Sequence, residues 1–419
     1  MYGYRYPYIR FRFVPGFIKR KCSMGKRVFA LMTAALSMLL LSSCGSGSNE
    51  ADLSGDNGSG RIISKVVINT SVRKTGQYPE EIVVTLGKKP AGKKLSAGDF
   101  HMTGEAGGWQ AKQTHSFETD FESVELKGDT LTLVPRDFPE KFFYVEAFTV
   151  SCTPDPEFSF SNEDVTEIHT PLADDFLTYV RDGAGEKRAD GIELLKSDYD
   201  LDYHLYTPNK TGKMPIVVVF HGFGDTSNLL TYRTAVEWVE PDNQKNRPCY
   251  VLAPTIDDPT YYSDSGRSKA IEQVKLVIDD MIAAGQVDPD RIYVMGNSFG
   301  GMASIEFAEK YPESTTAVLA LCPALRYSRN AFKNLKKMKD VPVYFCHAEH
   351  DGTIEVSTSE TAVKILKSVG AGDVNFKKYT DDEMNAAGAS PDNNNTYSYH
   401  HVELAVMPDE AYMEWLMGK

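Results

Sequence analysis

Residues 291–307, RIYVMGNSFGGMASIEF, decide the fold of this chain. The stretch begins with a β-branched and aromatic run typical of a buried strand, and it continues as small and apolar residues at helical spacing. Between the two, Gly296 and Gly300 flank Ser298 and permit a tight turn of the backbone. A strand that turns directly into a helix with a serine at the turn is the nucleophile-elbow pattern, which exposes the hydroxyl to a base. The alternative is an ordinary connection between a strand and a helix.

The segments around this stretch alternate between expected strands and helices. The continuous apolar run at 216–220 is typical of a central parallel strand, and residues 268–284 carry apolar side chains at helical spacing. Such alternation favours a mostly parallel sheet with helical crossovers. The sequence therefore predicts an α/β domain over residues 199–419. Its further expected strands lie at 203–208, 249–254, 317–321 and 341–346.

Residues 61–171 follow a different pattern, with alternation of period two and no convincing helix. Roughly seven short strands in about a hundred residues favour a small antiparallel sandwich of immunoglobulin type. The region holds no titratable cluster and no metal motif, so we expect a structural or substrate-presenting role. Residues 172–198 are predicted to be a linker to the α/β domain.

The N-terminal residues indicate export. In residues 1–43 a basic pair, Lys26 and Arg27, precedes a run of about fourteen apolar or small residues, which suits a signal peptide. LSSCG at 41–45 resembles the lipobox of bacterial lipoprotein signal peptides, and this resemblance implies that Cys44 is lipidated. We expect a bacterial cell-envelope protein, on the periplasmic face or cell surface, whose membrane contact is the lipid anchor alone. Met24 is an alternative start to Met1, and residues 44–60 predict a flexible tether.

Charge and cysteine usage restrict the possible partners. The net charge is -13, and without the eight basic residues of segment 1–43 it is -21, which argues against nucleic acid or an anionic membrane surface as partner. The cysteines beyond the leader lack metal-ligand spacing, and no phosphate-binding loop is present, so we expect neither a metal nor a cofactor. Buried free thiols are expected at Cys152, Cys249, Cys322 and Cys346; a disulfide between the last two is the alternative.

Four motifs of the C-terminal half occur in a recognisable order: HGFGD at 221–225, GNSFGG at 296–301, HAEHDGTI at 347–354, and a histidine followed by EWL at 414–416. With them, residues from about 201 to 419 resemble the α/β-hydrolase superfamily, in particular the secreted prolyl-oligopeptidase-like and polyhydroxybutyrate-depolymerase-like esterases. Some of these carry an Ig-like domain in front. The order matches the nucleophile, acid, histidine order of that fold.

The resemblance implies a role for each motif. Ser298 is the expected nucleophile and Asp351 the acid that orients a neutral imidazole base. The base is one of two adjacent histidines. In the relatives a large apolar or aromatic side chain usually follows the base by three residues, and Leu404 has this place relative to His401. We therefore predict His401 as the base, with His400 as the alternative.

The remaining site predictions concern substrate and oxyanion. By resemblance, the backbone amides of Phe223 and Phe299 form the oxyanion hole. Tyr262 and Trp238 are the aromatic residues predicted to contact substrate. Residues 380–399 replace a short glycine-rich link of the relatives, and we expect either a lid over the site or a plain surface insertion.

Together these features predict a serine carboxylic-ester hydrolase that works through an acyl-enzyme. Acetyl or feruloyl-type esters of carbohydrates are the expected substrates, because an envelope lipoprotein with an Ig-like module suits the capture of glycans. Two alternatives stay open: a serine peptidase of the prolyl-oligopeptidase-like type, and a non-catalytic glycan-binding lipoprotein. His221 and His347 are expected to be structural.

Overall fold

The computed structural model describes residues 62–419, apart from residues 74–75, 89, 91, 93, 108–113, 140–141, 143–144, 154, 182–185, 188–192, 225–233 and 391–397. The predicted leader (1–43), the lipidation of Cys44 and the tether (44–60) lie outside the described residues and stay predictions. Within the described ranges, no helix combines the length and the apolar character needed to cross a membrane.

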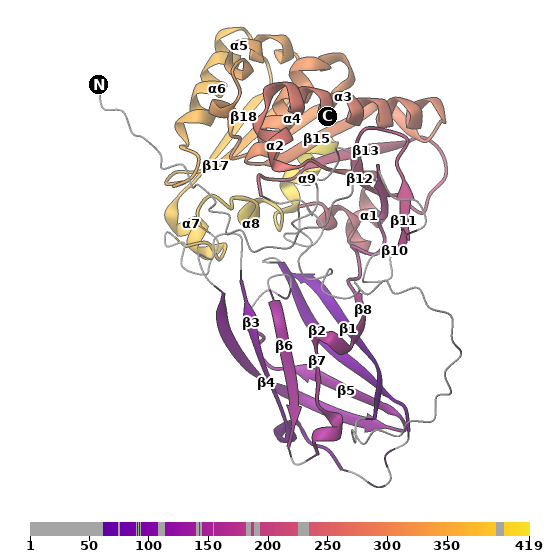
Figure 1. The fold of residues 1–419 in the computed structure, drawn as a ribbon. Helices are drawn as coiled ribbons and strands as arrows, with labels where there is room; N and C mark the ends of the chain where they lie inside the picture. Colours follow the sequence, from indigo (N-terminus) through magenta and orange to yellow (C-terminus); the bar gives the residue numbers. More distant parts are fainter. Residues whose placement is uncertain are drawn as a thin grey trace, which may run out of the picture. The chain divides into compact units, whose positions relative to one another are not determined.

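The N-terminal region is all β, as its period-two pattern predicts (Figure 1). Its eight strands form one sheet in the order β7-β6-β3-β4-β5-β2-β1-β8, in which only the β1–β8 pair is parallel. The strands are β1 (Ile63–Arg73), β2 (Gly76–Leu86), β3 (Phe100–Ala106), β4 (His115–Lys127), β5 (Thr130–Pro135), β6 (Val145–Cys152), β7 (Phe160–Ser161) and β8 (Val165–His169).

One long strand joins the two halves of this sheet. The first part of β4 pairs with β3, and its second part, from Phe121, pairs with β5. Apolar side chains from both halves, such as Met102 and Leu133, belong to one buried core. A sheet that folds over a shared core in this way is a β-sandwich. Its assignment to the immunoglobulin type stays a prediction.

The C-terminal region contains a ten-stranded sheet in the order β10-β11-β9-β12-β14-β13-β15-β16-β17-β18. The six strands from β14 to β18 in this order run parallel to one another, as the alternation of strands and helices predicts. The strands are β9 (Leu177–Val180), β10 (Glu186–Lys187), β11 (Glu193–Lys196), β12 (Asp202–Tyr206), β13 (Met214–Phe220), β14 (Tyr250–Thr255), β15 (Val287–Asn297), β16 (Ala317–Leu321), β17 (Val343–Ala348) and β18 (Val374–Tyr379).

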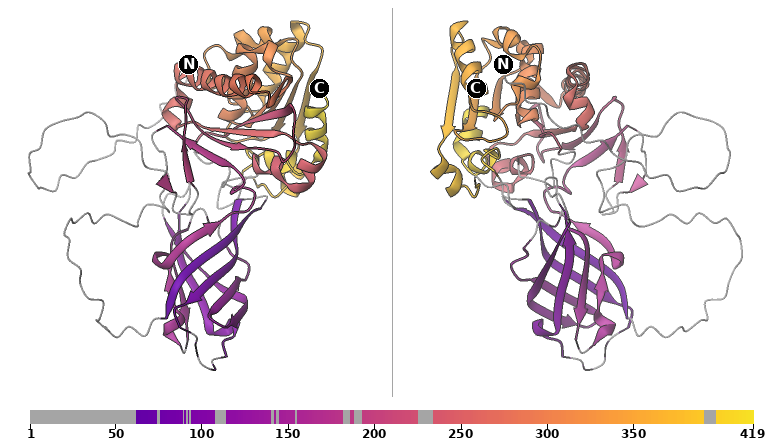
Figure 2. Two further views of the ribbon diagram at one scale, coloured as in Figure 1. Left: turned by 90° about the vertical axis from the view of Figure 1, so that its right-hand side faces the viewer. Right: turned by 60° about the vertical axis from the view of Figure 1, so that its left-hand side comes forward.

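Helices cover both faces of this sheet (Figures 1 and 2). Successive residues of β13 point to opposite faces. Val218 therefore joins a core with α3, α4 and α6, while Val217 and Val219 join a second core with α8 and α9. The helices are α1 (Pro241–Asn246), α2 (Asp258–Tyr262), α3 (Asp264–Ala283), α4 (Phe299–Lys310), α5 (Ala331–Asn334), α6 (Ser357–Ser368), α7 (Asp381–Ala386), α8 (Glu403–Val406) and α9 (Glu410–Met417).

The prediction of a linker at 172–198 is wrong. Strands β9, β10 and β11 lie inside that range and extend the ten-stranded sheet, so the α/β domain begins at Leu177 rather than at residue 199. Strands of two to four residues are too short to show a period. Strand β9 is stabilised by pairing with β12, for example Tyr179 opposite Tyr203, and β11 and β10 follow it in the sheet. The sequence pattern does not show such pairing, because the paired residues are distant in sequence.

The four cysteines within the described residues are buried free thiols, as predicted. Cys322 follows β16 and Cys346 lies on the neighbouring β17. The backbone N–H of Cys322 donates to the carbonyl oxygen of Cys346 at 2.8 Å, yet no disulfide joins the two side chains. The structure therefore contradicts the alternative prediction of a Cys322–Cys346 disulfide.

Candidate active site

The predicted elbow is a sharp turn between β15 and α4. Ser298 stands between them with φ 55° and ψ −119°, a backbone conformation that L-residues rarely adopt and that costs about 1–3 kcal/mol. Backbone hydrogen bonds hold it there: Ser298 N–H donates to Leu321 O at 2.9 Å, and Ala324 N–H donates to Ser298 O at 2.9 Å. Within the described residues no hydrogen bond uses Ser298 Oγ, so this hydroxyl is available for chemistry.

Sterics explain the glycines around this serine. A Cβ atom at Gly300 would overlap the carbonyl oxygens of Phe220 and His221, and one at Gly296 would overlap that of Phe220. The turn therefore packs directly against the end of β13, and only residues without a side chain fit at these two positions.

The structure brings His400, not His401, to Asp351. His400 Nδ1 lies 2.7 Å from Asp351 Oδ2, whereas His401 Nδ1 lies 2.8 Å from Glu403 Oε1. The prediction of His401 as the partner of the acid is thus corrected in favour of the alternative. The physical reason is that His401 has its own buried carboxylate two residues away. Glu403 in the sequence was the signal that could have indicated this.

The Asp351 carboxyl group is fully buried and held on all sides. Its Oδ1 accepts the backbone N–H groups of Thr353 and Ile354 at 2.8 and 2.9 Å, and His347 Nε2 lies 3.2 Å from Oδ2. Burial raises the pKa of Asp351, but the hydrogen bonds from His347 and His400 lower it by more, and the net pKa lies far below its usual range. Asp351 is therefore a carboxylate near neutral pH.

His221 and His347 have the structural roles predicted for them. His221 Nδ1 lies 2.7 Å from Gly222 O and its Nε2 accepts the N–H of Ile256 at 2.9 Å, which fixes the loop after β13. Burial lowers the pKa of His221 to about 4, so its imidazole is neutral. The fully buried His347 lies 2.8 Å from both Ser359 Oγ and Ile354 O and so supports the Asp351 loop.

Cys322 connects the elbow to the acid and histidine. Cys322 follows Leu321, whose carbonyl oxygen accepts the N–H of Ser298. The Sγ atom of Cys322 lies 3.1 Å from His400 O, and the backbone φ of Cys322 is 35°. Ligand atoms of Cys322, Asp351 and His400 lie within 4.8 Å of one another, and this is the group within the described residues that could hold a metal. In this structure the Asp351 carboxylate is hydrogen-bonded to the His400 imidazole.

The two residues predicted for the oxyanion hole lie together. Phe299 is the first residue of α4, Phe223 follows β13, and their rings are 5.0 Å apart. Asp258 Oδ1 accepts the N–H of Gly224 at 2.7 Å and so holds the Phe223 loop against α2. Within the described residues, no hydrogen bond uses the backbone N–H of Phe223 or Phe299.

The two aromatic residues predicted to contact substrate lie in different environments. Tyr262 on α2 is 64% exposed and its ring stacks on that of Phe299, next to Ser298. Trp238 is fully buried, and its Nε1–H donates to Met295 Sδ at 3.1 Å. The prediction for Trp238 is wrong, because its short 3-10 helix (Val236–Val239) packs this side chain into the core.

The predicted insertion at 380–399 is folded where the structure describes it. Thr380 caps α7 through a reciprocal pair of hydrogen bonds with Glu383, and Met384 is fully buried. Tyr399, at the other end, is also buried and its hydroxyl donates to Asn385 Oδ1 at 3.0 Å. Residues 391–397 lie outside the described residues, so a lid stays a prediction.

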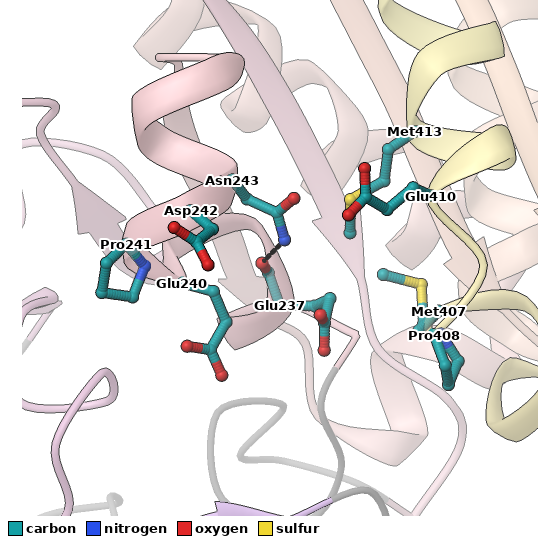
Figure 3. A pocket seen from close by; sticks show the side chains of 9 residues that line it. All are labelled: Glu237, Glu240, Pro241, Asp242, Asn243, Met407, Pro408, Glu410 and Met413. Atoms are coloured by element: carbon teal, nitrogen blue, oxygen red, sulfur yellow. Dashed lines mark hydrogen bonds between the residues drawn. The ribbon is translucent and has the colours of Figure 1, made fainter.

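A separate pocket of about 380 Å³ lies between residues 237–243 and 407–413 (Figure 3). Asn243 Nδ2 donates to Glu237 O at 2.7 Å at one wall, and Met413 and Glu410 form another. None of the predicted site residues lines this pocket. Its acidic side chains alone specify no ligand.

Comparison with known proteins agrees with this fold. Residues 207–390 match the family model described as Phospholipase/Carboxylesterase. The quorum-quenching protein AidA of Acinetobacter baumannii (strain MDR-ZJ06) is 26% identical over 140 residues, covering 32% of this chain and 43% of AidA. The chain thus spans less than half the length of this curated relative.

A solved structure is similar over a longer range. The crystal structure of a thermostable esterase has a TM-score of 0.62 and 22% identity, and the match covers 84% of this chain and 98% of that chain. This coverage exceeds the α/β domain, so the likeness of fold extends into the N-terminal β-domain. The likeness to this esterase structure concerns the fold, and the family match covers residues 207–390.

Proposed function

We propose that this chain is a serine carboxylic-ester hydrolase with Ser298 as nucleophile, His400 as base and Asp351 as the orienting acid. The observation that carries the proposal is the 2.7 Å contact between His400 Nδ1 and the buried Asp351 carboxylate, together with the strained backbone of the elbow serine. Asp351 fixes the tautomer that leaves His400 Nε2 free to accept a proton.

The reaction follows from these positions. His400 Nε2 takes the proton of Ser298 as Oγ attacks the ester carbonyl, and the N–H groups of Phe223 and Phe299 stabilise the oxyanion. His400 then returns the proton to the departing alcohol, which leaves an acyl group on Ser298. A water molecule, deprotonated by the same imidazole, hydrolyses this acyl-enzyme and restores the serine.

The substrate class belongs to the same proposal: acetyl or feruloyl-type esters of carbohydrates, acted on by an enzyme anchored in a bacterial envelope through lipidated Cys44. The support is the predicted lipobox and the separate β-domain, which suits glycan capture if it is of immunoglobulin type. A prolyl-oligopeptidase-like peptidase could use the same three residues, and a non-catalytic glycan-binding lipoprotein would leave Ser298 unreactive.

Hydrolysis by the full-length protein and by Ser298→Ala tests the proposal. The panel contains p-nitrophenyl acetate and butyrate, methyl ferulate, acetylated xylan and aminoacyl p-nitroanilides. We expect ester hydrolysis by the wild type and a loss on the order of 10⁴-fold or more in Ser298→Ala, which removes the attacking oxygen. Cleavage of the anilides alone would favour the peptidase. Absence of fluorophosphonate labelling at Ser298 in folded protein would contradict any serine hydrolase.

The pH dependence follows from the environment of His400. Burial lowers the pKa of this imidazole, but the contact with Cys322 and the hydrogen bond and negative charge of the Asp351 carboxylate raise it, for a net pKa well above the ordinary 6.5. The base must be neutral, so activity is lost as the pH falls through this raised pKa. We expect the acid limb of kcat/KM to lie above pH 6.5.

A profile of kcat/KM from about pH 5 to about pH 9 checks this expectation. The rate of fluorophosphonate labelling over the same range is the control, because it depends on the base but not on the substrate. An acid limb at or below pH 6.5 in both measurements would show that the carboxylate does not raise the pKa of the base.

A further inference from the structure

Four aromatic rings cluster around Phe299, the residue after the elbow serine, and form what we term the aromatic surface: Phe223, Tyr262, Phe299 and Tyr327. They come from four separate segments: the loop after β13, helix α2, the start of α4, and the short 3-10 helix Leu325–Tyr327. Tyr262 and Tyr327 are 64% and 47% exposed, whereas Phe299 beneath them is 6% exposed.

The rings touch in a continuous group. Tyr327 lies 5.1 Å from Phe299 and 6.2 Å from Tyr262, measured between ring centroids. Tyr262 stacks on Phe299 at 6.4 Å with an interplanar angle of 19°. These separations lie in the range in which aromatic rings attract one another. The two tyrosines are therefore held by their neighbours while one side of each stays open to solvent.

The frame beneath the aromatic surface is rigid. Arg267 is fully buried, and its Nη1 donates to the carbonyl oxygen of Tyr261 at 2.7 Å while two of its nitrogens bind Glu306 on α4. Asp257 caps α2 by accepting the N–H of Thr260 at 2.9 Å. Helix α2, which carries Tyr262, is thereby fixed to the helix that follows Ser298.

The aromatic surface also adjoins the reacting atoms. Phe299 is bonded to Ser298, and the backbones of Phe299 and Phe223 carry the proposed oxyanion donors. A flat ring that packs on the Phe299 and Tyr262 side chains would lie only a few bonds from an ester carbonyl placed at Ser298. An acetyl group has no aromatic face to stack on these rings, whereas a planar aromatic acyl group has one.

We infer that this surface binds the aromatic ring of the substrate, which makes aromatic esters of the hydroxycinnamate kind the preferred class over acetyl esters. The inference rests on the proposed ester hydrolysis. Stacking supplies the affinity, and the exposed tyrosines supply rigid contact area at a small cost in side-chain entropy.

Kinetics on two substrates tests the inference. Tyr262→Ala and Tyr327→Ala are each expected to lower kcat/KM for methyl ferulate by about 3- to 10-fold, as expected for the loss of one aromatic contact. For acetylated xylan the change should stay within about twofold, because its acetyl esters carry no aromatic ring. Tyr262→Phe keeps the ring and should retain most of the activity. Leu276→Ala, which removes a 47% exposed side chain of α3, is the control and should leave both substrates unaffected.

Binding without turnover separates this inference from the proposed function. Titration of Ser298→Ala with methyl ferulate should show saturable binding that is lost when Tyr262→Ala and Tyr327→Ala are added to it. Binding that survives these changes, or equal loss of activity on both substrates, would overturn the aromatic site. Tyrosine-dependent binding by a protein that hydrolyses no ester would instead support the site and overturn the proposed function.

Discussion

His400→Ala is expected to lower kcat/KM for ester hydrolysis on the order of 10⁴-fold or more, while His401→Ala retains activity within about tenfold. The two residues are adjacent in sequence, but only His400 contacts Asp351, at 2.7 Å. Removing it leaves the attacking Ser298 hydroxyl without a base. Removing His401 leaves the Asp351–His400 contact in place.

The pair of variants is its own control, since each removes one imidazole from the same turn. Steady-state kinetics on the best ester of the panel gives the two values, and circular dichroism shows whether each variant is folded. His401→Ala removes the hydrogen-bond partner of the buried Glu403 carboxylate, so we expect this variant to be less stable than the wild type. If His401→Ala is folded but inactive while His400→Ala is active, the assignment of His400 as the base is wrong.

Arg267→Met is expected to lower the free energy of unfolding of the α/β domain by about 3–5 kcal/mol. The fully buried guanidinium binds Glu306 through two nitrogens at 2.9 Å and Asp264 at 2.6 Å. Without it, the carboxylate of Glu306 stays in a largely buried place and has lost its partner. The hydrogen bond to Tyr261 O, which holds α2, is lost as well.

Urea unfolding measures this effect, with Lys269→Ala as the matched control. Lys269 lies on the same helix and its Nζ is 2.8 Å from Asp200 Oδ2, but its side chain is 65% exposed. Exposed ion pairs contribute roughly 0–1 kcal/mol, so the control should unfold nearly as the wild type does. Adding Glu306→Gln to Arg267→Met should recover part of the loss, because it removes the unpaired charge. A loss of less than about 1 kcal/mol in Arg267→Met would contradict the structural role of this cluster.

Much of the candidate site could be predicted because it depends on local sequence. The turn at Ser298 shows in the sequence as a strand pattern, a serine between glycines at 296 and 300, and a helix pattern, although the clashes that require these glycines involve Phe220 and His221 after a distant strand. The place of Asp351, just beyond an apolar strand, follows from the order of elements along the chain. The prediction that Tyr262 contacts substrate follows from its position after β14, at the edge of the sheet where ligands enter.

Other features depended on contacts between distant segments. Trp238 lies in a polar neighbourhood of the sequence, but its environment is set by Met295 on β15, which is far along the chain. The short strand β9 exists through its pairing with β12, and β11 and β10 continue the sheet from β9. The exposed Tyr327 escaped prediction because its partners, Phe299 and Tyr262, come from other elements.

The sequence by itself determined the alternation of strands and helices, the elbow at Ser298 and the acid at Asp351, because backbone sterics and the hydrophobic period act over a few residues. Only the tertiary structure decided which of two adjacent histidines faces that acid. Neighbouring side chains in an irregular turn point in different directions, and the direction of each is set by its partner: Asp351 for His400, 49 residues away, and Glu403 for His401.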